Sequence, residues 1–390
     1  MKDRTRVIHQ PSVELPPDNW PLVAPIYQSV KFEMERIDES LKAFRGERPG
    51  FFYTRTSNPT NRQLEEQLAT MQGREDCIVS ASGVAAISTC LLSLCKAGDH
   101  ILCFVETYGP TRYLIRRLLS KFGVDYTMLS LEDDEGIERV LAERPTRLVY
   151  FESPTNPITR IADIERICRA ARAAGALSVM DNTFAGFHNH GQYDVDIFLH
   201  SLTKYASGHG DVMGGAIIGS RELVGSMRRD ASSLGPVLDP HAAFLILRGL
   251  KTYFLRYDAQ AASAMKIAGW LEAQPAVALV RYPGLPGHPR HELARRQMKE
   301  FGTMVTFDLK GGADDARVFV EALELFAITA SLGSVESLVM PPHFMQPRDF
   351  SAEQARISGV TPSTVRLSIG AEDADDLIAD LQQALGRIRS

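Results

Sequence analysis

The sequence predicts an α/β protein in which helices cover both faces of a mainly parallel β-sheet. Three observations predict it. Short apolar runs alternate with helical patterns between residues 61 and 220, a pattern typical of parallel sheets. The chain, at 390 residues, exceeds the size at which one hydrophobic core keeps growing, so we expect a second domain. The pattern changes after about residue 245, where longer helical stretches predict a smaller α+β domain.

Residues 1–60 are expected to form an arm and not a domain. They are rich in proline and aromatic residues and have little periodicity before Met34. A segment of this kind buries too little surface alone to offset the entropy lost when it becomes ordered. We therefore expect the arm to contact a neighbouring subunit.

Residues 61–245 are predicted to form the large domain. Its expected strands are 76–79, 100–105, 147–151, 176–180, 197–200 and 215–219, and its expected helices are 83–94, 111–122 and 163–174. Ligands of such sheets bind beyond the carboxyl ends of the strands. The polar residues of greatest interest fall at those ends: Ser82, Tyr108, Glu152, Asp181 and Lys204.

Residues 246–390 are predicted to form the C-terminal domain. Helices are expected at about 241–274 and 288–300, and a strand at 304–308. The sequence Tyr282-Pro-Gly-Leu-Pro-Gly287 predicts a loop between them.

Composition argues against several classes of function. The net charge is −5 without a basic block, so a nucleic-acid partner is not expected. Neither a membrane span nor a secretion signal is expected, because no run approaches 18 apolar residues and the charged N-terminus lacks an apolar region. Five cysteines without a CxxC motif indicate reduced thiols and a cytoplasmic location. His188-Asn-His190 lacks a third ligand at suitable spacing, so no metal is expected.

Asp181 and Lys204 together indicate one cofactor, pyridoxal phosphate. A lysine holds this cofactor as a Schiff base, and a carboxylate keeps its pyridine nitrogen protonated so that the ring withdraws electrons. Asp181 ends one apolar run, and Lys204 follows the next within His200-Ser-Leu-Thr-Lys-Tyr205. The hydroxyls of Ser201 and Thr203 are suitable ligands for the phosphate.

Motifs along nearly the whole chain resemble the Cys/Met-metabolism family of pyridoxal-phosphate enzymes, the trans-sulfuration enzymes of fold type I. The motifs occur in the family's order: Pro25-Ile-Tyr-Gln28, Tyr53-Thr-Arg-Thr-Ser-Asn-Pro-Thr60, Ser82-Gly-Val-Ala-Ala-Ile87, Tyr108-Gly-Pro-Thr111, Glu152-Ser-Pro-Thr-Asn-Pro157, Asp181-Asn-Thr-Phe184, Ser201-Leu-Thr-Lys-Tyr205, Leu247-Arg-Gly-Leu-Lys-Thr252, Tyr282-Pro-Gly-Leu285, Ser331-Leu-Gly333 and Arg366-Leu-Ser-Ile-Gly370. Each motif is weak alone, but their order is specific.

The resemblance implies a role for each matching residue. Lys204 and Tyr108 would be catalytic, with Tyr108 stacked on the cofactor ring. Asp181 would pair with the pyridinium. The phosphate would lie on the helix start formed by Ser82, Gly83 and Val84, together with Ser201 and Thr203. Substrate would be bound by Asn156, Ser331 and Arg366, whose guanidinium matches the α-carboxylate. Glu152 would organise the site without reacting.

The arm has its own implied role. Tyr53 and Arg55 resemble a pair that binds the cofactor phosphate of the neighbouring subunit. The resemblance therefore implies active sites shared between subunits, within a homotetramer built as a dimer of dimers.

The reaction is expected to be γ-elimination from a methionine- or homoserine-like amino acid, giving a 2-oxo acid and ammonia. Ala330 stands where γ-synthases and cystathionine γ-lyases carry a glutamate, and the segment that starts at Arg55 is similar to methionine γ-lyases. Pro110, in contrast, is closer to β-lyases, and Lys31 and residues 340–350 follow no clear pattern. Cystathionine β-lyase, O-acylhomoserine sulfhydrylase, cystathionine γ-synthase-type transfer and a canavanine-type γ-linked substrate remain open.

Overall fold

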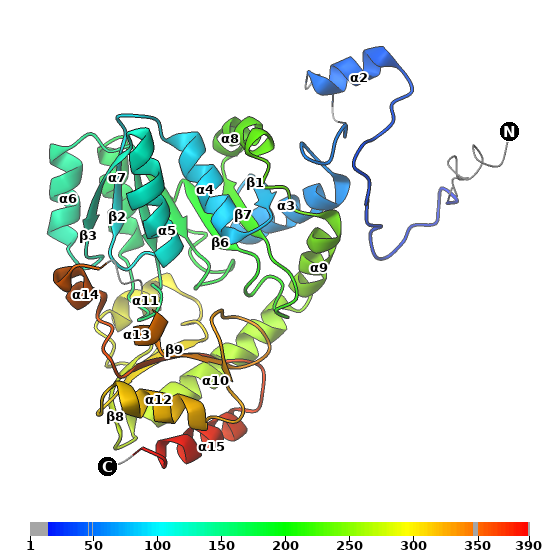
Figure 1. Cartoon of the computed structure of the whole chain (residues 1–390). Helices are drawn as coiled ribbons and strands as arrows, with labels where there is room; N and C mark the ends of the chain where they lie inside the picture. The colour runs from blue at the N-terminus through cyan, green and yellow to red at the C-terminus, as the bar shows by residue number, and fades with distance from the viewer. Residues whose placement is uncertain (1–14, 46, 49, 346–349, 389–390) are drawn as a thin grey trace.

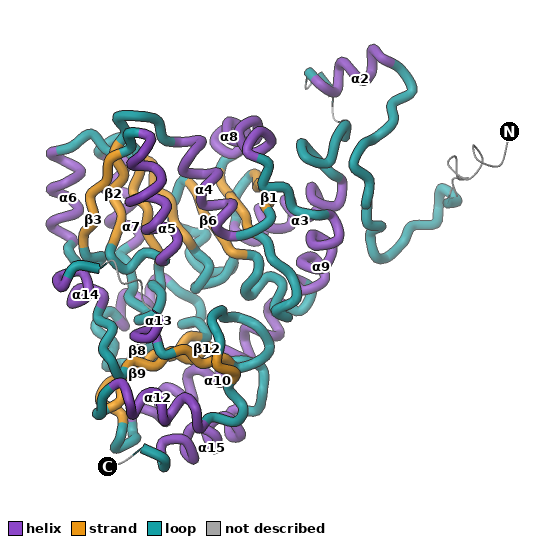
Figure 2. Tube along the Cα trace, in the orientation of Figure 1, coloured by secondary structure: helices purple, strands orange, loops and turns teal. Residues whose placement is uncertain are grey.

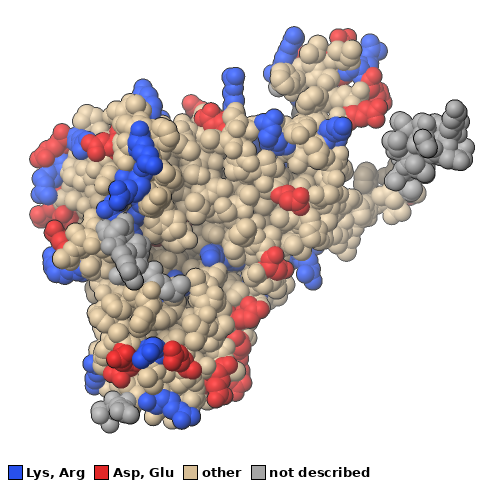
Figure 3. Space-filling view, viewed as in Figure 1, with Lys and Arg blue, Asp and Glu red and all other residues tan. Residues whose placement is uncertain are grey.

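The computed structural model describes residues 15–45, 47–48, 50–345 and 350–388. Two β-sheets form separate layers in the body, and an N-terminal segment extends away from it (Figures 1 and 2). Basic and acidic side chains are interspersed on the face in Figure 3. Within the described residues, no helix is both long and apolar enough to cross a membrane.

The large sheet has seven strands in the order β1-β7-β6-β5-β4-β2-β3. All neighbouring strands are parallel except β7, which is antiparallel to both β1 and β6. The mainly parallel sheet expected from the sequence is therefore present. The strands are β1 (Asp76–Ser80), β2 (His100–Phe104), β3 (Asp125–Leu129), β4 (Leu148–Glu152), β5 (Leu177–Asp181), β6 (Ile197–Ser201) and β7 (Gly215–Gly219).

Helices cover both faces of this sheet because successive side chains along each strand point to opposite faces. On one face Leu102 and Phe104 pack with α3 (Pro59–Gln72), α6 (Asp134–Glu143), α7 (Ile164–Ala173) and α9 (Pro240–Leu250). On the other face Ile101 and Cys103 pack with α4 (Gly83–Leu94), α8 (Arg221–Leu234) and the helical segment that begins with α5 (Gly109–Tyr113). That segment continues as a π-helical turn (Leu114–Leu118) and a 3₁₀ turn (Leu119–Phe122).

The second sheet has the order β10-β11-β12-β9-β8 and is mainly antiparallel. Its strands are β8 (Val277–Arg281), β9 (Met304–Leu309), β10 (Ala327–Ile328), β11 (Leu338–Met340) and β12 (Thr364–Ser368). A separate apolar core joins it to α10 (Tyr253–Glu272), α12 (Ala313–Ala322) and α15 (Ala374–Leu385). The short helices α11 (His291–Gln297), α13 (Pro342–Met345) and α14 (Ala352–Ser358) complete this part of the chain.

Several details differ from the sequence prediction; for example, the helix expected at 288–300 is shorter, His291–Gln297. Strand β3 was not expected; it lies at the edge of the sheet and is only partly buried, so its apolar signal is weak. The single helix expected at 241–274 is two helices, α9 and α10, with a break at Lys251 and Thr252. Near this break Gly249 approaches the turn after Lys204 so closely that a Cβ atom would lie 2.3 Å from the Ser207 carbonyl oxygen.

The N-terminal segment contains helix α2 (Ile37–Phe44), none of whose residues is buried, and lies apart from both cores (Figure 1). Its large apolar side chains are exposed: Trp20 by 80% and Leu22 by 101%. An isolated bridge between Lys31 and Tyr53 joins the two stretches of chain that flank α2. This geometry matches the expected arm, although the boundaries at 60 and 245 stay predictions.

Candidate active site

A cavity of about 1440 Å³ lies at the carboxyl ends of the parallel strands, where it is also bordered by residues 330–332 and by Arg366 of β12. It brings together eleven of the predicted site residues: Ser82, Gly83, Val84, Tyr108, Asn156, Asp181, Ser201, Thr203, Lys204, Ser331 and Arg366. Segments that are far apart in the sequence therefore meet at one site.

Lys204 lies in the turn that follows β6. Its Nζ donates a hydrogen bond of 2.7 Å to the Ser331 hydroxyl, which links the two parts of the chain across the cavity. Burial and the nearby positive charge of Arg366 lower the pKa of Lys204 to about 8, whereas the charge of Asp181 acts in the opposite direction. The neutral form of this amine, which a nucleophile or base requires, is therefore far more populated near physiological pH than in an ordinary lysine.

Asp181 ends β5, and no basic side chain among the described residues bonds to it. Its Oδ1 accepts the Thr183 N–H at 3.0 Å, and its Oδ2 accepts the Tyr150 hydroxyl at 3.4 Å. Burial raises the pKa of Asp181, while these hydrogen bonds and Lys204 favour its charged form. Neutral donors thus hold the carboxylate in place, and its charge remains available to a cationic ligand.

The start of α4 forms a cradle beside Ser201. The amides of Gly83 and Val84 lie in the first turn, where a helix leaves N–H groups without an internal acceptor. A Cβ on Gly83 would lie 2.8 Å from the Cβ of Ser201, so only glycine allows this approach. The Ser82 hydroxyl accepts the Ala85 N–H at 3.1 Å and caps the helix. The Thr203 hydroxyl accepts the Gly214 N–H at 3.1 Å.

Arg366 lies on the opposite side of the cavity and is only 4% exposed. It donates to Asn156 Oδ1 at 2.9 Å and to the Ser331 carbonyl oxygen at 2.8 Å. Its Nε has no hydrogen-bond partner in the part of the chain that the structure describes, and burial lowers the pKa of Arg366 to about 10. The bond to Arg366 also helps to hold Ser331 at a φ of 105°, which is unusual for a residue other than glycine. A buried guanidinium bonded only to neutral groups is suited to bind a carboxylate.

Glu152 ends β4, and Tyr108 lies four residues after the end of β2, directly before α5. The Tyr108 N–H donates to Glu152 Oε1 at 2.6 Å, and its ring is 40% exposed. Burial, together with the charge of Asp181, raises the pKa of the Tyr108 hydroxyl. Glu152 is buried beside Asp181, its register partner on β5.

Comparisons with known proteins agree with this geometry. The profile of a family described as "Cys/Met metabolism PLP-dependent enzyme" matches residues 4–386. The chain belongs to this family. It is 40% identical over 368 residues to an L-methionine gamma-lyase of Pseudomonas putida, covering 93% of this chain and 92% of that protein. It is 39% identical over 371 residues to an O-succinylhomoserine sulfhydrylase of Pseudomonas aeruginosa, covering 93% and 90%.

A solved structure from Campylobacter jejuni, which contains N′-pyridoxyl-lysine-5′-monophosphate at its position 205, superimposes with a TM-score of 0.90. It is 32% identical, and the match covers 94% of this chain and 96% of that one. Fold type I and the dependence on pyridoxal phosphate, both expected from the sequence, are thereby confirmed. The substrates of this family are amino acids of cysteine and methionine metabolism.

The cavity fits the cofactor of this family. An anion can bind at the cradle between Gly83 and Ser201, which any larger side chain at position 83 would fill. A protonated ring nitrogen can pair with Asp181, which lacks a basic partner of its own. Within the described residues, no cluster of His, Cys, Asp or Glu is suited to a metal ion.

Tyr53 and Arg55 do not line this cavity. Arg55 donates to the Ser232 carbonyl oxygen at 2.7 Å, near the end of α8, and lies over the Tyr53 ring at 5.7 Å. Both residues belong to the exposed arm, so their predicted contact with a neighbouring subunit stays a prediction.

Sequence reasoning missed several residues of the site. Thr183 is important because it bonds to Asp181 and its hydroxyl accepts the Ser201 N–H at 2.9 Å. Its position two residues after Asp181 was the available signal. Arg117, Met213 and Phe350 also line the cavity, but only the fold brings them there. Met340 and Pro342 of the 340–350 segment line it too, whereas residues 346–349 lie outside the described residues.

Proposed function

We propose that this protein is a pyridoxal-phosphate-dependent lyase that eliminates the γ-substituent of a methionine- or homoserine-like amino acid. The observation that carries the proposal is that, among the described residues, no acidic side chain lines the cavity without a partner or an assigned role. Three described acidic residues line it: Glu106 is paired with Arg160, Glu152 accepts the Tyr108 N–H, and Asp181 faces the expected ring nitrogen. With Ala330 beside Ser331, the distal ammonium of cystathionine has no partner, whereas a thioether or ester needs none.

The cofactor, when bound, supplies an electron-withdrawing ring that acidifies the Cα proton of the amino acid. The start of α4, with Ser201 and Thr203, would hold its phosphate. Asp181 would hold a proton on its ring nitrogen, and the Tyr108 ring would lie against its face. These roles are supported by the cradle at Gly83 and by the neutral partners of Asp181.

Lys204 would then accept the Cα proton, since its lowered pKa makes the neutral amine far more populated than in an ordinary lysine. The Ser331 hydroxyl, 2.7 Å from Nζ, would orient that amine. Arg366 would bind the α-carboxylate and thereby point Cα towards Lys204, with Asn156 fixing the guanidinium. Loss of a second proton, from Cβ, expels the γ-substituent as a thiol. Addition of water releases 2-oxobutanoate and ammonia.

A transferase is the second candidate, because Arg117 lies at the cavity and has no recorded ion pair in the described structure. Its charge would suit a γ-substituent that ends in a carboxylate, such as a succinyl ester. The relative named O-succinylhomoserine sulfhydrylase is nearly as similar as the methionine γ-lyase. Transfer would require sulfide to replace the leaving group at Cγ.

Product analysis distinguishes these reactions. We expect purified enzyme to convert L-methionine to 2-oxobutanoate with a higher kcat/KM than L-cystathionine, and Ala330→Glu to shift that ratio towards cystathionine. Dominant pyruvate from cystathionine would make the enzyme a β-lyase. Homocysteine formed from O-succinylhomoserine and sulfide faster than any keto acid would make it a transferase.

We also propose a dimer of dimers in which each active site receives Tyr53 and Arg55 from its neighbour. The exposed apolar side chains of the arm support this assembly. Lys204→Ala and Arg55→Ala should each be nearly inactive, while a mixed dimer carrying both should recover about half of the wild-type activity, because one site has neither lesion. Mixed dimers as inactive as their parents would contradict the shared site. A cytoplasmic location stays a prediction.

A further inference from the structure

Glu152 is a buried carboxyl group that connects two loops of the cavity. Its Oε1 accepts the Tyr108 N–H at 2.6 Å, and the backbone N–H of Asn156 donates to the same carboxyl group. Tyr108 begins α5, and Asn156 holds Arg366 through a bond of 2.9 Å. One side chain therefore fixes both the aromatic loop and the support of the carboxylate clamp.

Glu152 also lies beside a second carboxyl group, that of Asp181. It pairs in register with Asp181, so the two side chains leave adjacent parallel strands at the same edge of the sheet. Glu152 is 5% exposed, and no salt bridge within the described residues involves either carboxyl group. Two adjacent carboxyl groups without a cationic partner are not both ionised without a large energetic cost, so one of them holds a proton.

The surroundings decide which group remains charged. Burial and the charge of Asp181 raise the pKa of Glu152 well above its usual range, and the two backbone N–H groups and the charge of Arg112 only partly oppose this. Tyr108 and Tyr150, the other titratable groups nearby, carry no positive charge. Asp181, in contrast, receives bonds from Thr183 and Tyr150 and the positive charge of Lys204.

We propose that Glu152 is a positioning residue that works as an uncharged carboxylic acid, so that Asp181 carries the single negative charge at this edge. The inference rests on the proposed function only in using the same site. An ionised Glu152 would compete with Asp181 for the cationic ring. A neutral Glu152 holds Tyr108 and Asn156 without competing with Asp181 for the ring.

The direct test is infrared difference spectroscopy of the holoenzyme at pH 7, wild type minus Glu152→Gln. The expected difference is the carbonyl stretch of a protonated carboxyl group. The matched control is Glu106→Gln, because Glu106 is equally buried in the same cavity but is paired with Arg160. The difference spectrum of wild type minus Glu106→Gln should instead show that carboxylate bands are lost in the variant. Carboxylate bands lost from Glu152→Gln would overturn the proposal, whichever amino acid proves to be the substrate.

Kinetics test the positioning role separately. Glu152→Gln keeps an acceptor oxygen for Tyr108 and no charge, so kcat and KM should stay within about threefold of wild type. Glu152→Ala removes the acceptor, and KM for the amino acid should rise about 10-fold as Asn156 and Arg366 lose their support. If Glu152→Gln loses as much activity as Glu152→Ala, a charged glutamate is required and the proposal fails.

Discussion

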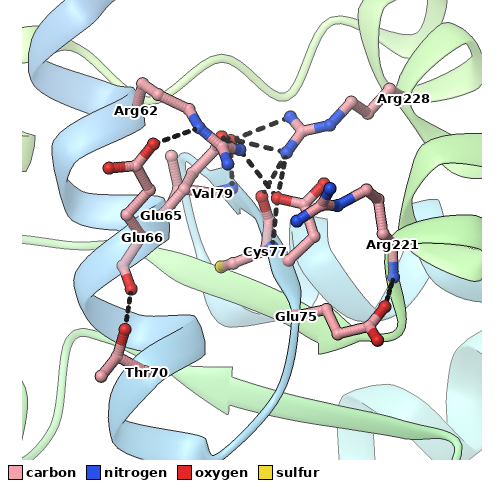
Figure 4. Close-up of polar contacts among 10 residues, drawn as sticks. Arg62, Glu65, Glu66, Thr70, Glu75, Cys77, Val79, Arg221 and Arg228 are labelled. Atoms are coloured by element: carbon pink, nitrogen blue, oxygen red, sulfur yellow. Dashed lines mark hydrogen bonds and ion pairs between the residues drawn. The ribbon is translucent and has the colours of Figure 1, made fainter.

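The ion cluster between α3 and α8 and the active site contain the same kinds of charge but pair them differently. The ion cluster consists of Arg62, Glu65, Asp76 and Arg228 (Figure 4). Both arginines bond to both carboxylates, with distances between 2.7 and 3.1 Å. Backbone N–H groups of Cys77 and Val79 complete the arrangement. Here the charges neutralise one another and join α3, β1 and α8.

The active site also has two carboxyl groups and two cations: Asp181, Glu152, Lys204 and Arg366. Among these four described side chains no ion pair forms, and their partners are hydroxyls, amides and carbonyl groups. Arg366 even keeps a buried Nε without any partner. The comparison teaches that the ion cluster is built for stability, whereas the active site keeps its charges oriented and unneutralised for ligands.

The largest expected effect follows from removing the base. Lys204→Ala should lower kcat about 1000-fold or more, since general-base catalysis contributes on that scale. Tm of the apoenzyme should not fall, because Lys204 makes no ion pair within the described residues and its buried charge is removed. Steady-state kinetics with calorimetry checks both expectations. Lys251→Ala, at an exposed lysine after α9, is the control and should behave as wild type.

Arg366→Met should raise KM for the amino acid about 100-fold, because a charge-assisted contact with the α-carboxylate is lost. Unlike a lesion in the ion cluster, it should leave Tm unchanged or higher, as a buried guanidinium with an unbonded Nε is removed. Kinetics and Tm are measured on the same preparation. A marked fall in Tm would mean that Arg366 serves stability as well.

Arg228→Met should have the opposite signature. We expect the free energy of unfolding to fall by about 2 kcal/mol, less than for a fully buried pair because Arg228 is one-third exposed. The kcat of the folded enzyme should not change. Arg221→Met, on the same helix but exposed, is the control; Arg221 contacts Glu75 through its backbone N–H. An equal loss of stability in both variants would contradict a stabilising role of the ion cluster.

The smallest effect concerns pH. The pKa of Lys204 is lowered from its ordinary 10.5 to about 8 by burial and by Arg366. Above pH 8 the unfolded chain binds more protons at this position than the folded apoenzyme, so stability should rise with pH between about 8 and 10.5. Below pH 8 this contribution is constant. Measuring Tm of the wild-type apoenzyme and of Lys204→Met across this pH range isolates the contribution of Lys204. If the two curves of Tm against pH were parallel, they would contradict the lowered pKa.

The sequence predicted those parts of the molecule whose signal is local. Strands β4 and β6 are fully or almost fully buried apolar runs, and chemistry-bearing residues such as Glu152 and Lys204 lie at or just after their ends. Edge strand β3 lacks such a run. Arg117 and Thr183 were missed because their importance depends on contacts made by the fold. The contact of Arg55 with another subunit involves a second copy of the chain, which no local pattern describes.

The central claim is that Lys204 is the residue kept unpaired to hold the cofactor opposite Asp181. The most direct measurement is borohydride reduction of the purified holoenzyme, followed by peptide mapping with mass spectrometry. The account predicts that the pyridoxyl label is found on Lys204 and is absent from Lys204→Ala. A label on another lysine, or none in a protein saturated with pyridoxal phosphate, would contradict it.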